Sequence, residues 1–182
     1  YLCRHFGLPE VADYWESVVA LNTWQQHRIA RLVVEKLFGT VTGKRLAVLG
    51  FAFKADTNDT REAPAIRICR DLLEEGAQLA IHDPKVVAQQ MARDLQQDAA
   101  PQLDALSGTG NWMEAGSVED AVRGADAVLV LTEWQQYRDL NWMALAGRMR
   151  KPAWVFDARA VTDPEQVRAA GLTLWRVGDG EG

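Results

Sequence analysis

The sequence predicts an α/β fold in which a doubly wound, mostly parallel sheet follows one long N-terminal helix. From residue 44 onward, short apolar runs rich in β-branched residues alternate with helix-like segments, which is the pattern of parallel strands joined by crossover helices. Before them, residues 9–38 contain no glycine and no proline after the first position. A chain of 182 residues can form one such domain with an additional element.

The first predicted element is the helix over residues 9–38. Pro9 suits the first turn of a helix, and Glu10 and Asp13 favour its positive N-terminal end. About 30 residues would extend roughly 45 Å. The large apolar side chains cover more than one stripe, whereas a helix on the surface of a monomer needs only one. We expect the second stripe to pack on another domain or a second subunit, with burial inside one subunit as the alternative.

The later elements follow from apolar runs, caps and glycines. KRLAVLG ends in Gly50 and indicates a buried strand, ADAVLVLT is the clearest strand, and Ser117 predicts a helix cap. The turn-rich segment 98–111 is predicted to be a loop. The predicted strands run over 44–50, 77–83, 112–115, 125–132, 152–158 and 172–177. The predicted helices that follow the first strand run over 61–75, 85–97, 117–123, 141–149 and 163–170.

This alternation is Rossmann-like, and such sheets bind ligands at the carboxyl ends of strands near the point where the strand order reverses. Functional residues are therefore expected just after positions 50, 83, 132 and 157. We divide the chain into residues 1–43, which contain the long connecting helix, and the α/β domain over 44–182.

Composition excludes several functional classes. The net charge is -5, without a basic block, so the sequence favours neither nucleic acid nor an anionic membrane as a partner. No apolar run approaches the ~20 residues of a membrane helix. Cys3 and Cys69 form no metal-ligand pattern, and we expect a reducing, cytoplasmic environment. The chain begins YLCRHFGLPE, without methionine, so we expect it to be an excised part of a longer protein.

The turn after the first strand carries the strongest chemical pattern. GFAFKADTNDTREAPA lacks the GxGxxG dinucleotide fingerprint. It contains Lys54 and Arg61 together with the hydroxyls of Thr57 and Thr60, and cations at a strand-to-helix turn can hold phosphate oxygens with the backbone N–H groups of the helix start. Lys54 would act as a point charge and Arg61 as a bidentate donor. The alternative is a solvated turn whose charges only cap the next helix.

Four motifs occur in order: GFAFKADTNDTRE, IHDPKV, LTEWQQY and VFDARAV. Together with YLCRHFGLPEVADYW, they resemble the C-terminal half of the UDP-glucose/GDP-mannose dehydrogenase family, over nearly the whole chain. The DTNDTRE form is similar to the members that act on UDP-glucose. The resemblance identifies residues 1–43 as the end of a central dimerisation region and 44–182 as a UDP-sugar-binding domain.

The resemblance implies an NAD-dependent oxidation of UDP-glucose to UDP-glucuronate in two steps. The family uses a cysteine nucleophile in a glycine-flanked motif and an N-terminal NAD domain, and this chain contains neither. Cys3 lacks the flanking glycines and Cys69 lies inside a predicted helix, so we assign no catalytic residue and expect the isolated chain to be inactive. A homo-oligomer through the long helix is also implied.

The residues carried over by the resemblance are few. Phe53, Lys54 and Arg159 match family positions that contact the UDP-sugar, and Arg61 matches a residue that reaches NAD. No metal ligand is implied.

Around Arg159 the family has DGR or DRN, whereas this chain has Ala158 and Ala160. Ala158 would disfavour the positive φ that glycine permits, and Ala160 removes a polar side chain. A surface salt bridge between Arg159 and Asp157 is the alternative to a ligand role.

Three further readings remain open. The chain could belong to a dehydrogenase for another nucleotide sugar, such as UDP-N-acetylmannosamine or GDP-mannose. It could also be a non-catalytic nucleotide-binding α/β module or a dimerisation module.

Asp83 follows a strand, where an acidic residue can meet a ribose hydroxyl, but a turn residue satisfied by backbone hydrogen bonds is the preferred interpretation.

Overall fold

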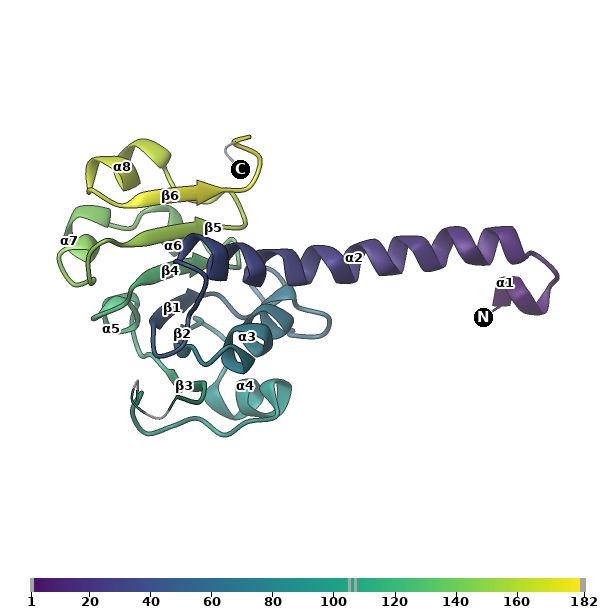
Figure 1. The fold of residues 1–182 in the computed structure, drawn as a ribbon, viewed down its shortest axis with the longest axis horizontal. Coiled ribbons are helices and arrows are strands. Elements are labelled where there is room, and N and C mark those ends of the chain that lie inside the picture. Colours follow the sequence, from purple (N-terminus) through teal and green to yellow (C-terminus); the bar gives the residue numbers. More distant parts are fainter. Residues whose placement is uncertain (1, 105, 107, 181–182) are drawn as a thin grey trace.

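The computed structural model describes residues 2–104, 106 and 108–180, which form a six-stranded sheet flanked by helices (Figure 1). The strands are β1 (Arg45–Leu49), β2 (Gln78–His82), β3 (Asn111–Glu114), β4 (Ala127–Val130), β5 (Trp154–Asp157) and β6 (Thr173–Arg176). The helices are α1 (Leu2–His5), α2 (Pro9–Lys36), α3 (Pro64–Glu74), α4 (Ala88–Leu95), α5 (Val118–Val122), α6 (Gln135–Arg138), α7 (Trp142–Ala146) and α8 (Pro164–Ala169).

The sheet has the order β3-β2-β1-β4-β5-β6, and all of these strand pairings are parallel. The chain builds outward from β1 to β3 and then crosses back to β4 and builds in the other direction. The order therefore reverses between β1 and β4, which is where doubly wound sheets bind ligands. The predicted doubly wound, Rossmann-like fold is confirmed.

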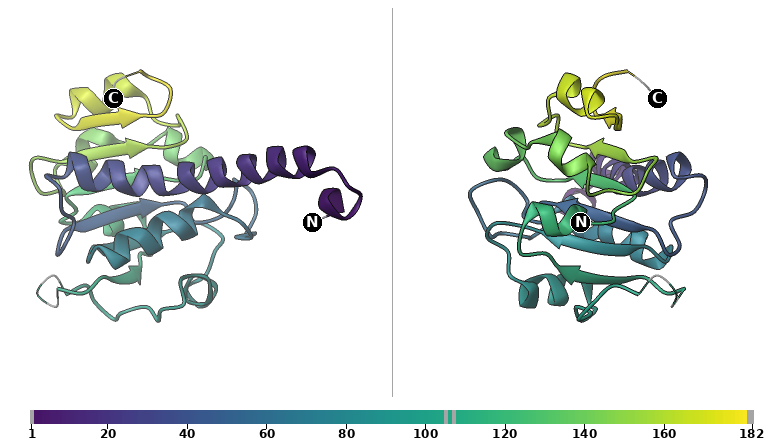
Figure 2. Two further views of the ribbon diagram at one scale, coloured as in Figure 1. Left: turned by 45° about the vertical axis from the view of Figure 1, so that its right-hand side comes forward. Right: turned by 90° about the vertical axis from the view of Figure 1, so that its left-hand side faces the viewer.

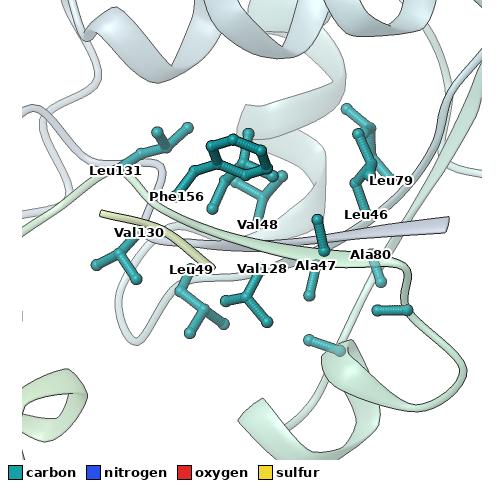
Figure 3. Packing of buried hydrophobic residues seen from close by; sticks show 14 of the residues in the cluster. Leu46, Ala47, Val48, Leu49, Leu79, Ala80, Val128, Val130, Leu131 and Phe156 are labelled. Carbon is teal, nitrogen blue, oxygen red and sulfur yellow. The ribbon is translucent and has the colours of Figure 1, made fainter. Parts of the chain in front are cut away.

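Both faces of the central strands are buried. Leu46, Val48 and Phe156 point to one face, and Leu49 and Val130 point to the other (Figure 3). All five side chains have 0% exposed surface. α2 and α3 pack together over one face, while α5 contacts β1 and β2 from the opposite face (Figures 1 and 2). Strands covered on both faces need continuous apolar runs, which is why the sequence shows runs rather than alternation.

Only the C-terminal half of α2 packs on the sheet domain. Ile29, Ala30 and Val33 are buried in the core, whereas Val11, Trp15 and Val19, spaced by four positions in the N-terminal half, are 42%, 58% and 65% exposed. The N-terminal half extends away from the sheet and carries α1 at its far end (Figures 1 and 2). α1 packs beside this stripe but leaves all three residues exposed, and the interface predicted for the long helix stays a prediction.

The largest boundary difference concerns the turn after β1. The helix predicted over 61–75 begins only at Pro64, because Glu62 has a left-handed φ of 57° that a helix cannot contain. Residues 50–63 therefore form a longer loop than predicted, hereafter the β1–α3 loop. It contains Phe53, Lys54 and Arg61.

The other differences are small. The strand predicted over 112–115 lies one residue earlier, and the short helix α6 was not predicted. Positions 105 and 107 of the predicted loop lie outside the described residues, as do positions 1, 181 and 182 of the predicted domains. The division at residue 43 stays a prediction, although the last turns of α2 belong to the sheet core.

Candidate nucleotide-sugar site

The ends of β1 and β4 meet so closely that only glycine fits between them. Gly50 has a φ of +95°, and a Cβ atom there would lie 2.4 Å from Cβ of Thr132. The Thr132 hydroxyl donates to the carbonyl of Ala52 at 2.7 Å and is buried. These contacts fix the path of the chain as it leaves the sheet, and Phe53 is the first exposed residue beyond them.

Arg159 joins the strand ends around this point. Its Nη2 donates to the carbonyl of Phe53 and its Nε to the carbonyl of Leu131, both at 2.9 Å. Its Nε lies 3.3 Å from Oε2 of Glu133. The predicted alternative, a salt bridge with Asp157, is wrong: that carboxylate is buried and accepts the backbone N–H of Arg159 at 3.0 Å. Hydrogen bonds to described residues use only two N–H groups of the guanidinium, so part of it remains available to a ligand.

A cleft of about 600 Å³ lies beside this arrangement. Phe53, with 45% of its surface exposed, and Arg159, whose side chain is 30% exposed, contribute an aromatic ring and a cation to its lining. α2 contributes Val19, Asn22, Thr23, Gln25, Gln26 and Ile29. A lining that mixes apolar and polar side chains suits a ligand that has both apolar and polar parts.

Lys54 and Arg61 lie on the same loop but do not line the cleft. Arg61 hydrogen-bonds both carboxylate oxygens of Asp59 and lowers the pKa of that carboxyl to about 2. The Arg61 side chain is nevertheless 88% exposed. Lys54 is exposed and forms no hydrogen bond or ion pair with any described residue, although its charge also helps to lower the pKa of Asp59. The structure thus brings Phe53 and Arg159 together, with the Lys54 and Arg61 charges on the adjoining loop.

Asp83, at the end of β2, is a structural residue, as the preferred interpretation predicted. Its Oδ2 accepts the N–H groups of Phe51 at 2.7 Å and Ala52 at 3.0 Å, and its Oδ1 accepts those of Lys85 and Val86 at 2.9 and 3.0 Å. A carboxylate occupied in this way is not free to bind a ribose. Together with the missing GxGxxG, this argues against a dinucleotide at this strand end.

The backbone at the Arg159 turn differs from the expectation. The residue with a positive φ is Ala160, at 55°, and not Ala158. Ala158 is half-buried and packs against the core. The strain expected at position 158 therefore lies two residues later, where the family resemblance places a polar residue.

The sequence analysis did not identify three residues of the site. Glu133 pairs with Arg159, and Asn22 and Gln26 face the cleft from α2 without a hydrogen bond to any described residue. The spacing of Asn22 and Gln26 by four positions was the available signal, because such residues share one side of a helix. Nothing local to Glu133 distinguished it from a surface carboxylate.

The described residues contain no group of three or more His, Cys, Asp or Glu side chains arranged to hold a metal ion. None of the described helices combines the length and apolar character needed to cross a membrane. Cys69 is fully buried, and this burial raises the pKa of its thiol, so it is a poor nucleophile.

The chain is similar in sequence to plant enzymes. It is 43% identical to UDP-glucose 6-dehydrogenase 2 of Oryza sativa subsp. japonica over 185 residues, covering 98% of this chain and 38% of that protein. It is 41% identical to UDP-glucose 6-dehydrogenase 1 of Arabidopsis thaliana over 186 residues, covering 98% of this chain and 39% of that protein. The chain thus spans less than two fifths of the length of these relatives.

Its fold is similar to that of a UDP-glucose dehydrogenase from Pyrobaculum islandicum, with a TM-score of 0.69, 24% identity and coverage of 96% of this chain and 34% of that one. Residues 47–164 match the profile described as the UDP-glucose/GDP-mannose dehydrogenase family, UDP binding domain. This match includes the β1–α3 loop, the ends of β1, β4 and β5, and Arg159. The chain therefore belongs to the UDP-glucose/GDP-mannose dehydrogenase family and carries its UDP binding domain.

Proposed function

We propose that this chain is the UDP-sugar-binding part of an NAD-dependent UDP-glucose 6-dehydrogenase and that it binds UDP-glucose beside the cleft of Phe53 and Arg159. The observation that carries the proposal is Arg159, which ties the ends of β1 and β4 together and leaves part of its guanidinium free. The family match and the names of the relatives support the choice of ligand.

The proposed roles follow from charge and exposure. Lys54, exposed and without a hydrogen-bonded partner among the described residues, neutralises the diphosphate. Phe53 offers an apolar ring to the nucleotide sugar, and Arg159 donates hydrogen bonds to its oxygens. These residues position the substrate, so their contribution to the reaction is orientation and charge neutralisation rather than bond making.

In the proposed reaction the C6 alcohol of the sugar becomes a carboxylate, giving UDP-glucuronate. This change removes two hydrides and adds the oxygen of one water molecule, and each hydride would pass to a separate NAD, so one turnover would consume two. The exposed guanidinium of Arg61 is suited to a phosphate of that cofactor, while the occupied carboxylate of Asp83 is unsuited to its ribose. No described residue of this chain is assigned as a nucleophile, so we expect the chain alone to bind UDP-glucose without oxidising it.

Calorimetric titration with UDP and UDP-glucose at low salt tests the binding proposal. We expect one-site binding that Lys54→Ala weakens about ten- to a hundredfold, the loss typical of a hydrogen bond to a charged group. Lys44→Ala is the matched control, because Lys44 precedes β1 at the opposite edge of the sheet. Absence of UDP binding by the unaltered chain would overturn the proposal, and equal effects of the two variants would remove Lys54 from the site.

Competition decides between nucleotide sugars. We expect UDP-glucose to displace UDP more effectively than GDP-mannose or UDP-N-acetylmannosamine does. A preference for either of the other two sugars would assign the chain to a different member of the family.

We further propose that the chain forms a homo-oligomer through α2 and that it resides in the cytoplasm. The exposed apolar stripe on the N-terminal half of α2 supports the first proposal. The two free cysteines, Cys3 and Cys69, support a reducing compartment.

A further inference from the structure

The β1–α3 loop has a strained conformation. Asp56 and Glu62 have positive φ angles of 64° and 57°, although neither is glycine. Such conformations cost free energy and persist only when the surroundings impose them, and they gather at functional sites. Phe53 and Lys54 lie at the beginning of this strained segment. The contacts that impose its shape therefore bear on ligand binding.

One side chain from outside the loop holds its middle. Nε2 of Gln90, in α4, donates to the carbonyl of Asn58 and to Oγ1 of Thr60, both at 2.9 Å. Thr60 is only 5% exposed, so the contact is shielded from water. Gln90 itself is half-buried and does not line the cleft.

Two residues after β2 also hold the loop. Nζ of Lys85 donates to the carbonyl of the strained Asp56 at 3.1 Å and lies 5.8 Å from the centre of the Trp134 ring. The carboxylate of Asp83 accepts the N–H groups of Phe51 and Ala52. The segment between β2 and the first turn of α4 thus supports the loop at its beginning, at Asp56 and around Asn58, while Thr132 and Arg159 hold the carbonyls of Ala52 and Phe53.

We propose that Gln90 is a positioning residue for the UDP site: it holds the β1–α3 loop in the conformation that presents Lys54 to the diphosphate. The inference rests on the proposed function and adds a residue that touches no ligand. Gln90 is the most informative support to test. It is neutral, so its removal changes no charge near the phosphates, whereas Lys85 could also act on a phosphate directly through its ammonium group.

The experiment compares Gln90→Ala and Gln90→Met with Gln89→Ala and Gln89→Met. Gln89 is the exposed neighbour on α4, and its side chain forms no hydrogen bond with any described residue. Deuterium exchange over residues 53–62 and calorimetric UDP affinity are measured for each. We expect both Gln90 variants to exchange faster across the loop and to bind UDP roughly three- to tenfold more weakly, because only part of the free energy of two lost neutral hydrogen bonds is passed on to ligand binding. The Gln89 variants should match the unaltered chain.

A double-mutant cycle separates positioning from general destabilisation. If Gln90 acts by presenting Lys54, then Gln90→Ala should cost little further UDP affinity in a chain that already carries Lys54→Ala. Full additivity of the two losses would overturn the inference. Unchanged exchange in the Gln90 variants would also overturn it, as would faster exchange with unchanged affinity. Absence of UDP binding by the unaltered chain would overturn the proposed function, and the exchange data would still report whether Gln90 holds the loop.

Discussion

Ala160 shows how one residue can carry the strain of a functional turn. Its φ of 55° lies in the left-handed region, where the Cβ atom of an L-residue clashes with the backbone. The carbonyl of Ala160 accepts Nη2 of Arg176 at 3.2 Å, so the turn is held from outside. Its neighbour Arg159 gains its position at the strand ends through this strained turn.

Ala160→Gly should stabilise the chain. We expect the free energy of unfolding to rise by about 0.5–1 kcal/mol, because relief of the left-handed strain exceeds the entropy that glycine loses on folding. Ala158→Gly is the control: Ala158 has no positive φ and packs against the core, so its truncation should lower stability. Urea denaturation measures both, and a stability change of the same sign in the two variants would contradict the account.

His82 is a second residue with a definite physical consequence. Tyr137 donates its hydroxyl proton to the carbonyl of His82 at 3.0 Å, so the ring Nδ1, also 3.0 Å from that hydroxyl, acts as the donor to it. Burial lowers the pKa of His82, and the carboxylates of Asp83, Glu119 and Glu114 oppose the shift only in part. The neutral ring is therefore favoured in the folded state.

A lowered histidine pKa gives stability that acid removes. The stability is fully present above the ordinary pKa of about 6.5 and is lost as the pH falls from there through the lower pKa of the folded state. We expect the free energy of unfolding to decline from pH 7.5 to 5.5 and to decline less in His82→Gln. Denaturation curves of the unaltered chain and of His82→Gln at three pH values measure this difference. The other histidines titrate in both proteins, so their contribution cancels. An equal decline in the free energy of unfolding of the unaltered chain and of His82→Gln would contradict a lowered pKa of His82.

At the scale of elements, the contact between the ends of β1 and β4 is the tightest constraint near the site. Gly50 combines a positive φ with a distance of 2.4 Å from a would-be Cβ to Cβ of Thr132. Neither strand can move away to relieve this contact, because both are buried on two sides and paired with further strands. The pair of strands therefore sets the geometry from which the β1–α3 loop starts.

Gly50→Ala should be strongly destabilising. We expect a loss of at least about 3 kcal/mol, since overpacking and backbone strain act together. Gly116→Ala is the matched control, because nothing lies within 4 Å of its would-be Cβ atom, and its effect should stay within about 0.5 kcal/mol. Thermal and urea unfolding of the two variants measure the contrast. A well-folded Gly50→Ala chain of unchanged stability would contradict the strand contact.

At the scale of the whole molecule, the projecting half of α2 is the dominant feature (Figure 1). Val11, Trp15 and Val19 recur every four positions along one side of the helix and are 42%, 58% and 65% exposed, which is unusual for a stripe of large apolar side chains. Val19 also lines the cleft, so an apolar partner on α2 would lie close to the proposed ligand.

We expect the chain to associate with a second copy through this stripe. Light scattering after size exclusion should show a mass that doubles with increasing concentration, and Trp15→Glu should shift it toward the monomer. Ser17→Glu introduces the same charge two positions away, on another side of the helix, and should leave the mass unchanged. A monomer at all concentrations would refute pairing through α2, and equal effects of the two variants would indicate charge repulsion instead.

The sequence by itself determined the alternation of strands and helices, the helical character of residues 9–36 and the turn role of Asp83. These features are local: an apolar run, a cap or a glycine acts on its own few residues through burial and backbone sterics. The same reasoning failed at residues 61–63, because the left-handed Glu62 has no local signature.

Only the tertiary structure decided the strand order, the partner of Arg159 and the side of α2 that faces the cleft. Arg159 and Phe53 are 106 positions apart and meet because β5 pairs with β4 and β4 pairs with β1. Gln90 reaches Asn58 across 32 positions because their two connections lie at one edge of the sheet. Such contacts depend on which buried strands pair, a choice made by the packing of the whole core and not by any one segment.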